Sequence, residues 1–148
     1  MIKKISIVGA RGYVAEELIK IILRHNEFKL GFIGSHSHGG ELVDEIFPAL
    51  AGQNIKFENI QPENIKNFSS EIYVLAVPNG IAKKYVKALK NTPCKIIDLS
   101  YDMRCDNEWV YGLTEKNRKL IRAASKVSNP GCYATGAQLG LAPLLEKL

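Results

Sequence analysis

Short apolar runs alternate with helix-like segments along most of the chain, and this alternation constrains the fold more than any other feature. Strands are expected where β-branched and other apolar residues cluster, at residues 2–8, 28–34, 55–57, 71–77, 94–99 and 126–128. Apolar spacing and helix-start signals mark helices at residues 12–25, 62–68, 81–91, 114–124 and 132–148. Such alternation favours parallel strands joined by right-handed crossovers. The sequence therefore predicts the α/β class: a doubly wound, mostly parallel sheet with helices on both faces.

The chain is expected to form one domain over residues 1–148, which includes a turn and helix at 129–148, because no linker interrupts the elements before Asn129. Its 148 residues, 46% hydrophobic and 24% charged, fit a single domain. Residues 35–52 and 100–113 are rich in turn-forming and polar residues and are expected to be irregular. Thr114 is expected to cap the helix that follows it.

Charge and hydropathy narrow the classes of partner. A net charge of +5 suits an anionic partner, such as a phosphorylated cofactor or substrate. No basic run alternates with aromatic residues, so no nucleic-acid partner is expected. The densest basic cluster, Lys83, Lys84, Lys87 and Lys90, has helical spacing and is interpreted as a solvated helix face. No apolar run approaches the roughly 18 residues of a membrane span, and a cytoplasmic protein is expected.

The cysteines and histidines do not have the spacing of a metal site or a disulfide framework. Cys94, Cys105 and Cys132 are odd in number and widely separated. The close pair His36 and His38 has no further ligands arranged nearby, so no metal is expected.

A glycine-containing turn follows the first strand and opens the first helix. It has the form G-x-x-G-x-x-A, running from Gly9 through Arg11, Gly12, Tyr13 and Val14 to the closing alanine. Small residues make the tight turn, let backbone N–H groups approach a pyrophosphate, and allow the helix to pack close to the strand. The helix N-terminus adds positive potential. This context favours a Rossmann-like dinucleotide site over a purely structural turn.

The end of the second strand bears on the choice between NAD and NADP. An NAD site usually places Asp or Glu there to hold the ribose 2′-hydroxyl. The chain instead has Gly34-Ser35-His36-Ser37-His38, which lacks a carboxylate and offers several donors. NADP is therefore preferred, with Arg11 as the available positive charge; the alternative is that these residues form only a solvated loop.

The turn from Asn129 to Gly136 places Cys132 between a strand and a helix. The helix dipole and nearby N–H groups would stabilise a thiolate at this position, which makes Cys132 a candidate nucleophile. Cys94 begins an apolar strand and is interpreted as an inert core thiol. A nucleophilic thiol beside a nicotinamide suggests attack on an activated acyl group, such as an acyl phosphate, followed by hydride transfer to the thioester.

Five segments resemble the N-acetyl-gamma-glutamyl-phosphate reductases, nearly end to end. They are GARGYVAEEL (9–18), LAVPNGIA (75–82), IDLSYDMR (97–104), VYGLTEKNR (110–118) and SNPGCYATGAQLGLAPLL (128–145). The last segment is the most specific, because the related aspartate-semialdehyde dehydrogenases have a different cysteine motif.

The resemblance implies an NADPH-dependent reduction of an acyl phosphate to N-acetylglutamate semialdehyde, with release of phosphate, in arginine biosynthesis. It implies that Cys132 is the nucleophile, that Ser35 lies near the adenosine phosphate and Pro78 near the nicotinamide, and that Arg104 and Asn129 are close to substrate. The same resemblance assigns the cofactor turn to Gly9, Arg11, Gly12, Tyr13 and Val14. For Arg104, a loop-anchoring salt bridge is the alternative role.

The resemblance also implies features expected to lie outside these 148 residues. The family has a histidine general acid/base in a second α+β domain, and none of the three histidines here fits that role. Little turnover is therefore expected from the chain alone, and a homo-oligomer is expected for a full-length enzyme. Asn79 stands where the family often has histidine. Two alternatives remain open: an aminoadipyl-phosphate reductase, against which Tyr133 argues modestly, and a non-catalytic NADP-binding module.

Overall fold

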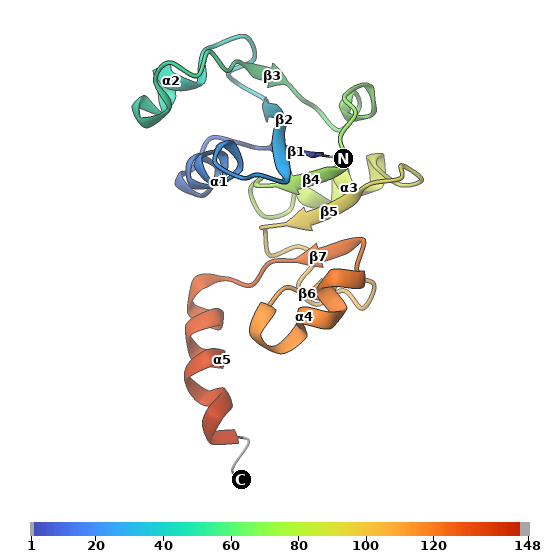
Figure 1. The fold of residues 1–148 in the computed structure, drawn as a ribbon. Helices are drawn as coiled ribbons and strands as arrows, with labels where there is room; N and C mark the ends of the chain where they lie inside the picture. The colour runs from blue at the N-terminus through green and yellow to red at the C-terminus, as the bar shows by residue number, and fades with distance from the viewer. Residues whose placement is uncertain (1, 146–148) are drawn as a thin grey trace.

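Seven parallel strands form one sheet in the computed structural model, which describes residues 2–145 (Figure 1). The spatial order is β3-β2-β1-β4-β5-β7-β6, and every neighbouring pair in it is parallel. The strands are β1 (Lys3–Val8), β2 (Phe28–Ser35), β3 (Phe57–Asn59), β4 (Ile72–Leu75), β5 (Lys95–Asp98), β6 (Val110–Tyr111) and β7 (Lys126–Ser128). The predicted α/β, doubly wound architecture is confirmed.

Five α-helices and two short 3₁₀ helices connect the described strands. They are α1 (Tyr13–Leu23), α2 (Val43–Ile46), η1 (Pro48–Leu50), η2 (Ile65–Asn67), α3 (Ala82–Ala88), α4 (Thr114–Ala123) and α5 (Cys132–Leu145). No helix within the described residues is both long and apolar enough to cross a bilayer. Residues 146–148 of the last predicted helix lie outside the described part of the chain.

Several local predictions were wrong. The segment 35–52 contains α2 and η1, and the segment 100–113 contains the edge strand β6. The third strand lies at Phe57–Asn59, two residues later than expected. Thr114 is the first helical residue of α4 and makes no capping bond, since extended Leu113 holds the cap position. These elements are short, so tertiary contacts rather than local pattern determine them.

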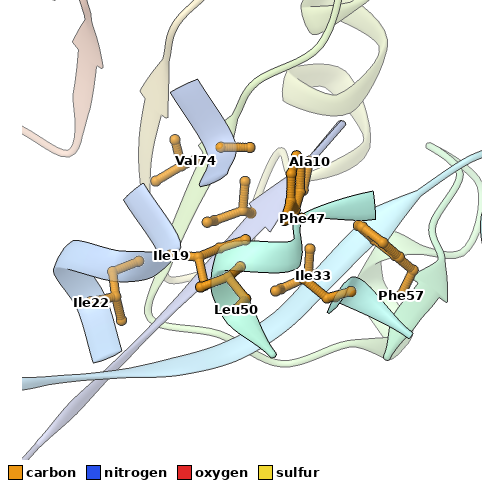
Figure 2. Packing of buried hydrophobic residues seen from close by; sticks show 11 residues of the cluster. Ala10, Ile19, Ile22, Ile33, Phe47, Leu50, Phe57 and Val74 are labelled. Carbon is orange, nitrogen blue, oxygen red and sulfur yellow. The ribbon is translucent and has the colours of Figure 1, made fainter. Parts of the chain in front are cut away.

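Apolar residues cover both faces of the sheet, as alternation along each strand requires. In β1, Ile7 belongs to the cluster packed on α1, whereas the next residue, Val8, belongs to the cluster packed on α3. Figure 2 shows the first cluster, in which side chains from the turn after β1, α1, β2, β3, β4 and the 47–50 segment gather: Ala10, Ile19, Ile22, Ile33, Phe47, Leu50, Phe57 and Val74. The second cluster includes Tyr85 and Leu89, which α3 and its C-terminal end contribute. Helices therefore lie on opposite faces, as predicted.

The winding direction changes between β1 and β4. From β1 the chain moves outward to β2 and β3, then returns to β4 on the other side of β1 and continues to β5. Ligands of doubly wound sheets bind beyond the carboxyl ends of the strands at such a switch point. The glycine turn follows β1 and the Pro78 loop follows β4, so both lie at this position.

Candidate functional site

The glycine turn is held tightly at the carboxyl end of β1. Gly9 has φ +81°, and a Cβ there would lie 2.7 Å from the carbonyl oxygen of Ala76 and from Val77 Cγ1. The N–H groups of Gly9 and Ala10 donate to the Gly34 carbonyl oxygen at 2.9 and 3.1 Å. Glycine is therefore required at position 9 both by conformation and by the approach of the β4 end.

The second glycine differs from the first. Gly12 caps α1 in an extended conformation, and a Cβ built on it would meet no atom of residues 2–145 within 4 Å. Ala15 is buried and brings α1 against the sheet, while Arg11, Tyr13 and Val14 are exposed around the open helix N-terminus. The space beside Gly12 is therefore available for a phosphate group to approach backbone N–H donors.

The loop after β2 is organised by Ser35. This serine is 3% exposed, and its Oγ accepts hydrogen bonds from the N–H groups of Ser37 and His38 at 3.3 and 3.2 Å. His38 Nδ1 pairs with Glu41 Oε2 at 2.6 Å, whereas His36 and Ser37 are exposed. Ser35 thus shapes the loop, and His36 and Ser37 are the side chains that it presents to solvent.

The loop that contains Pro78 is bonded to the loop that follows β5. Asp102 Oδ1 accepts a hydrogen bond from the Gly80 N–H at 2.6 Å, and Asn79 Oδ1 accepts one from the Tyr101 N–H at 3.0 Å. Pro78 itself is exposed. Asn79 therefore has a structural role here. We call this pair of bonds the loop latch.

A buried carboxylate is linked to the latch through Ser100. Asp98 is fully buried at the end of β5, where it accepts bonds from the N–H and the Oγ–H of Ser100. Ser100 Oγ in turn accepts the N–H of Asp102 at 3.1 Å. The second oxygen of Asp102, Oδ2, is buried without a hydrogen-bond partner among the described residues. Sequence reasoning missed Asp98, Ser100 and Asp102; their Asp-x-Ser-x-Asp spacing after a strand was the available signal.

Cys132 is the first residue of α5 and is exposed. The helix begins on the Gly131 carbonyl oxygen, which accepts bonds from both the N–H and the Oγ1–H of Thr135. The thiol therefore stands in the first turn, where helix N–H groups favour negative charge. The other two thiols lie elsewhere: Cys105 is in an exposed loop, and burial raises the pKa of Cys94.

Arg104 lies against the cysteine turn. Its Nε donates to the Asn129 carbonyl oxygen at 3.0 Å, and its Nη2 donates to the Leu99 carbonyl oxygen at 3.3 Å. A Cβ on Gly131 would lie 3.0 Å from Arg104 Nη1, so the guanidinium packs on the residue just before Cys132. Arg104 thus anchors the loop, as its alternative role expected, but it does so through backbone carbonyls; within the described residues it forms no salt bridge.

A groove connects the glycine turn to the cysteine turn, and its lining includes Tyr13, Val14 and Asn129. The groove has a volume of about 430 Å³ and lies between α1 and the residues that follow β5 and β7. Asn129 is exposed there. Its backbone N–H donates a hydrogen bond to the Asp98 carbonyl oxygen at 2.7 Å. The structure thus brings together the glycine turn, the latch and the cysteine turn at one edge of the sheet.

The histidines make their contacts away from the cysteine turn. His25 Nδ1 accepts the Glu27 N–H at 3.0 Å and its ring lies 4.6 Å from that of Phe28. His38 packs near Phe57. Within the described residues no group of three or more metal-ligating side chains gathers.

Comparison with known proteins identifies the family. Residues 4–124 match the model described as "Semialdehyde dehydrogenase, NAD binding domain". The chain belongs to this family. Solved structures of the family's fold include aspartate semialdehyde dehydrogenase II from Vibrio cholerae (TM-score 0.77, 20% identity, covering 100% of this chain and 44% of that one). Another is the aspartate semialdehyde dehydrogenase with NADP from Candida albicans (TM-score 0.74, 17% identity, 99% and 48%).

Curated relatives are more similar in sequence. An N-acetyl-gamma-glutamyl-phosphate reductase of Xanthomonas euvesicatoria is 40% identical over 148 residues, which are 99% of this chain and 46% of the relative. Protein ARG5,6, mitochondrial, of Candida albicans is 42% identical over 97% of this chain and 18% of its own length. The chain thus spans less than half the length of these relatives. Its glycine turn is the nucleotide-binding feature expected of an NAD-binding domain.

Proposed function

We propose that the chain is the cofactor-binding and nucleophile-bearing part of an N-acetyl-gamma-glutamyl-phosphate reductase. Exposed Cys132 at the start of α5, with the Arg104 guanidinium packed beside it on the same sheet edge as the glycine turn, carries this proposal. The 40% identity to a reductase of that name supports the choice over an aminoadipyl-phosphate substrate. A second domain would supply the general acid/base, and a homo-oligomer and a cytoplasmic location belong to the same proposal.

The cofactor assigned to this domain is NADP. The open space beside Gly12 fits a pyrophosphate, and the tight packing of Gly9 holds the turn against the β4 end. The exposed donors His36 and Ser37 follow β2, and the bonds from Gly9 and Ala10 to Gly34 bring the Arg11 turn next to them. No carboxylate occupies residues 34–38, which suits a ribose 2′-phosphate. When bound, the dinucleotide supplies the hydride for the reduction.

The residues of the chain support a two-stage reaction. The Cys132 thiolate attacks the acyl carbon, the acyl–oxygen bond to phosphate breaks, and inorganic phosphate leaves, so that a thioester remains on Sγ. Arg104 is placed to hold an anionic group of the substrate at the turn, and Asn129 lines the same edge. A bound dinucleotide would supply the hydride that reduces this thioester to the aldehyde, and Cys132 Sγ would be released as the thiolate. The latch holds the Pro78 loop against this edge throughout.

Two measurements test the proposal. Titration of the chain with NADPH and NADH, followed by nicotinamide fluorescence, is expected to give affinity at least roughly tenfold higher for NADPH because of the 2′-phosphate contacts. Absence of binding by either cofactor would refute the cofactor assignment. Addition of NADP, phosphate and N-acetylglutamate semialdehyde tests turnover, which is expected to be negligible for the chain alone.

Cysteine reactivity tests the nucleophile separately. Mass-spectrometric mapping after brief iodoacetamide treatment at pH 7.5 is expected to show Cys132 alkylated before Cys105, with Cys94 last. The exposed Cys105 is the internal control for accessibility, and the raised pKa of Cys94 keeps that thiol protonated. Equal rates at Cys132 and Cys105 would mean that the helix start does not activate the thiol.

A further inference from the structure

A second groove, of about 760 Å³, lies on the α3 side of the sheet and shares no lining residue with the candidate site. Its floor is apolar and includes Leu89, Ile96, Met103 and Trp109, all of which are buried. Its volume falls within the range of small-molecule sites, and its combination of an apolar floor with a few polar groups is typical of them.

One rim of this groove is basic. Lys83, Lys87 and Lys90 line it from α3 and the end of that helix, and all three are exposed. Residues 81–90 contain four lysines and no acidic residue, so like charges stand at i, i+3 and i, i+4 positions, which destabilises a helix. Within residues 2–145 these three lysines form no ion pair, whereas Lys126 on the opposite side is paired with Glu108 at 2.7 Å.

The charge distribution indicates what the groove would bind. Of its two acidic lining residues, Glu108 is neutralised by Lys126, and Asp106 stands against three unpaired lysines. An anion on the basic rim would relieve the repulsion along α3, while an apolar body would cover the floor beside Trp109. A solvated helix face, as the sequence suggested, accounts for Lys84 but not for a basic rim above an apolar floor.

We propose that this groove binds a small organic anion with an aromatic or apolar body, independently of the cofactor site. The anionic group contacts Lys83, Lys87 and Lys90, and the body packs over Met103 and Trp109. This site is separate from the proposed reductase site, and the proposal does not depend on the reductase chemistry.

The single tryptophan of the chain makes the site directly observable. Titration of ¹⁵N-labelled chain with 8-anilinonaphthalene-1-sulfonate is expected to shift the one indole N–H resonance, that of Trp109, together with backbone amides of residues 83–96. N-phenyl-1-naphthylamine has a similar apolar body without the sulfonate and is expected to bind more weakly. Shifts confined to α1, or none at Trp109, would overturn the proposal.

Charge variants separate the anion contact from general hydrophobic binding. The double variant Lys83→Gln, Lys87→Gln is expected to weaken sulfonate binding about threefold to tenfold and to leave naphthylamine binding unchanged. Lys116→Gln, Lys119→Gln on α4 removes two equally exposed lysines and is the matched control, expected to have no effect. Equal losses in both variants would overturn the proposal. So would a Trp109 resonance that moves with protein concentration alone, since a second copy of the chain would then cover the groove.

Discussion

Two glycines of the first turn differ in whether the fold itself requires glycine, although both are part of the same sequence motif. Gly9 is fixed by its positive φ and by contact with the β4 end, whereas Gly12 faces open space. Gly9→Ala is therefore expected to lower the free energy of unfolding by about 1–3 kcal/mol through backbone strain alone, and further through the clash. Urea unfolding followed by circular dichroism measures the loss.

Gly12→Ala is the matched variant, with the same methyl group added where no described residue lies within 4 Å of it. Its unfolding free energy is expected to stay within about 1 kcal/mol of the parent, the difference between Gly and Ala as a helix cap. NADPH affinity is expected to fall roughly tenfold, about 1.4 kcal/mol, because the methyl group occupies the approach to the pyrophosphate. Unchanged NADPH affinity in this variant would show that the backbone at Gly12 does not contact the cofactor.

At the scale of elements, the latch joins loops that follow two different strands. Asp102→Ala removes the acceptor for the Gly80 N–H and frees the Pro78 loop. NADPH affinity is expected to fall about fivefold, in line with roughly 1 kcal/mol for one partly exposed hydrogen bond. Asp102→Asn keeps an Oδ1 acceptor and is expected to bind NADPH within twofold of the parent. Equal losses in both variants would indicate that the carboxylate charge, not the bond, is required.

Two buried tyrosines on the α3 side of the sheet make the stability of the fold depend on pH. Burial raises the pKa of Tyr85, whose hydroxyl donates to the Ile60 carbonyl oxygen at 3.0 Å, and burial likewise raises the pKa of Tyr73. The unfolded chain would ionise first, near pH 10, while the folded state keeps its protons. Stability is thus fully present below that pH and is lost as pH rises through and above it.

Tyr85→Phe tests this dependence. The variant is expected to lower the free energy of unfolding by about 1–3 kcal/mol at pH 7, because the Ile60 carbonyl loses its hydrogen-bond partner. Its free energy of unfolding is also expected to decline less steeply between pH 9 and 11. Tyr133→Phe, which changes a phenol that is 92% exposed, is the control and is expected to follow the parent. Urea unfolding across this pH range is the measurement, and an unchanged alkaline decline in Tyr85→Phe would contradict the assignment.

Sequence reasoning predicted the elements whose own residues determine them. The second half of β1 and most of β4 are buried on both faces, and Gly9 follows the end of β1. The two-residue β6 was missed because it is a strand only through pairing with β7, which follows α4 in the chain. At the site, the cysteine turn was visible as a motif. The latch was not, since Asp102 and Gly80 are 22 residues apart and only the sheet order brings them together.

At the scale of the whole molecule, α5 is weakly integrated into the fold. Figure 1 shows it extending away from the sheet. No residue of α5 is buried from Cys132 to Leu144, and Tyr133, Leu141 and Leu144 are 92%, 54% and 60% exposed. Gln138 donates a hydrogen bond to the Tyr111 hydroxyl at 3.0 Å, but an apolar helix with so few packed side chains gains little of the burial that stabilises helices in proteins. The candidate nucleophile Cys132 therefore stands at the start of a helix that the described residues stabilise little by packing.

Hydrogen exchange measured by mass spectrometry is expected to reflect this difference. Amides of α5 should exchange faster than those of α1, whose Ala15, Ile19 and Ile22 are buried, because local opening of α5 exposes almost no new apolar surface. Gly136, Gly140 and Pro143 within α5 lower its intrinsic helix stability further. If the cofactor contacts the glycine turn and not the cysteine turn, NADPH should slow amide exchange around the glycine turn. It should then leave the exchange rates of the α5 amides unchanged. Protection of α5 equal to that of α1 in the chain alone would mean that another surface, such as a second copy, covers the helix.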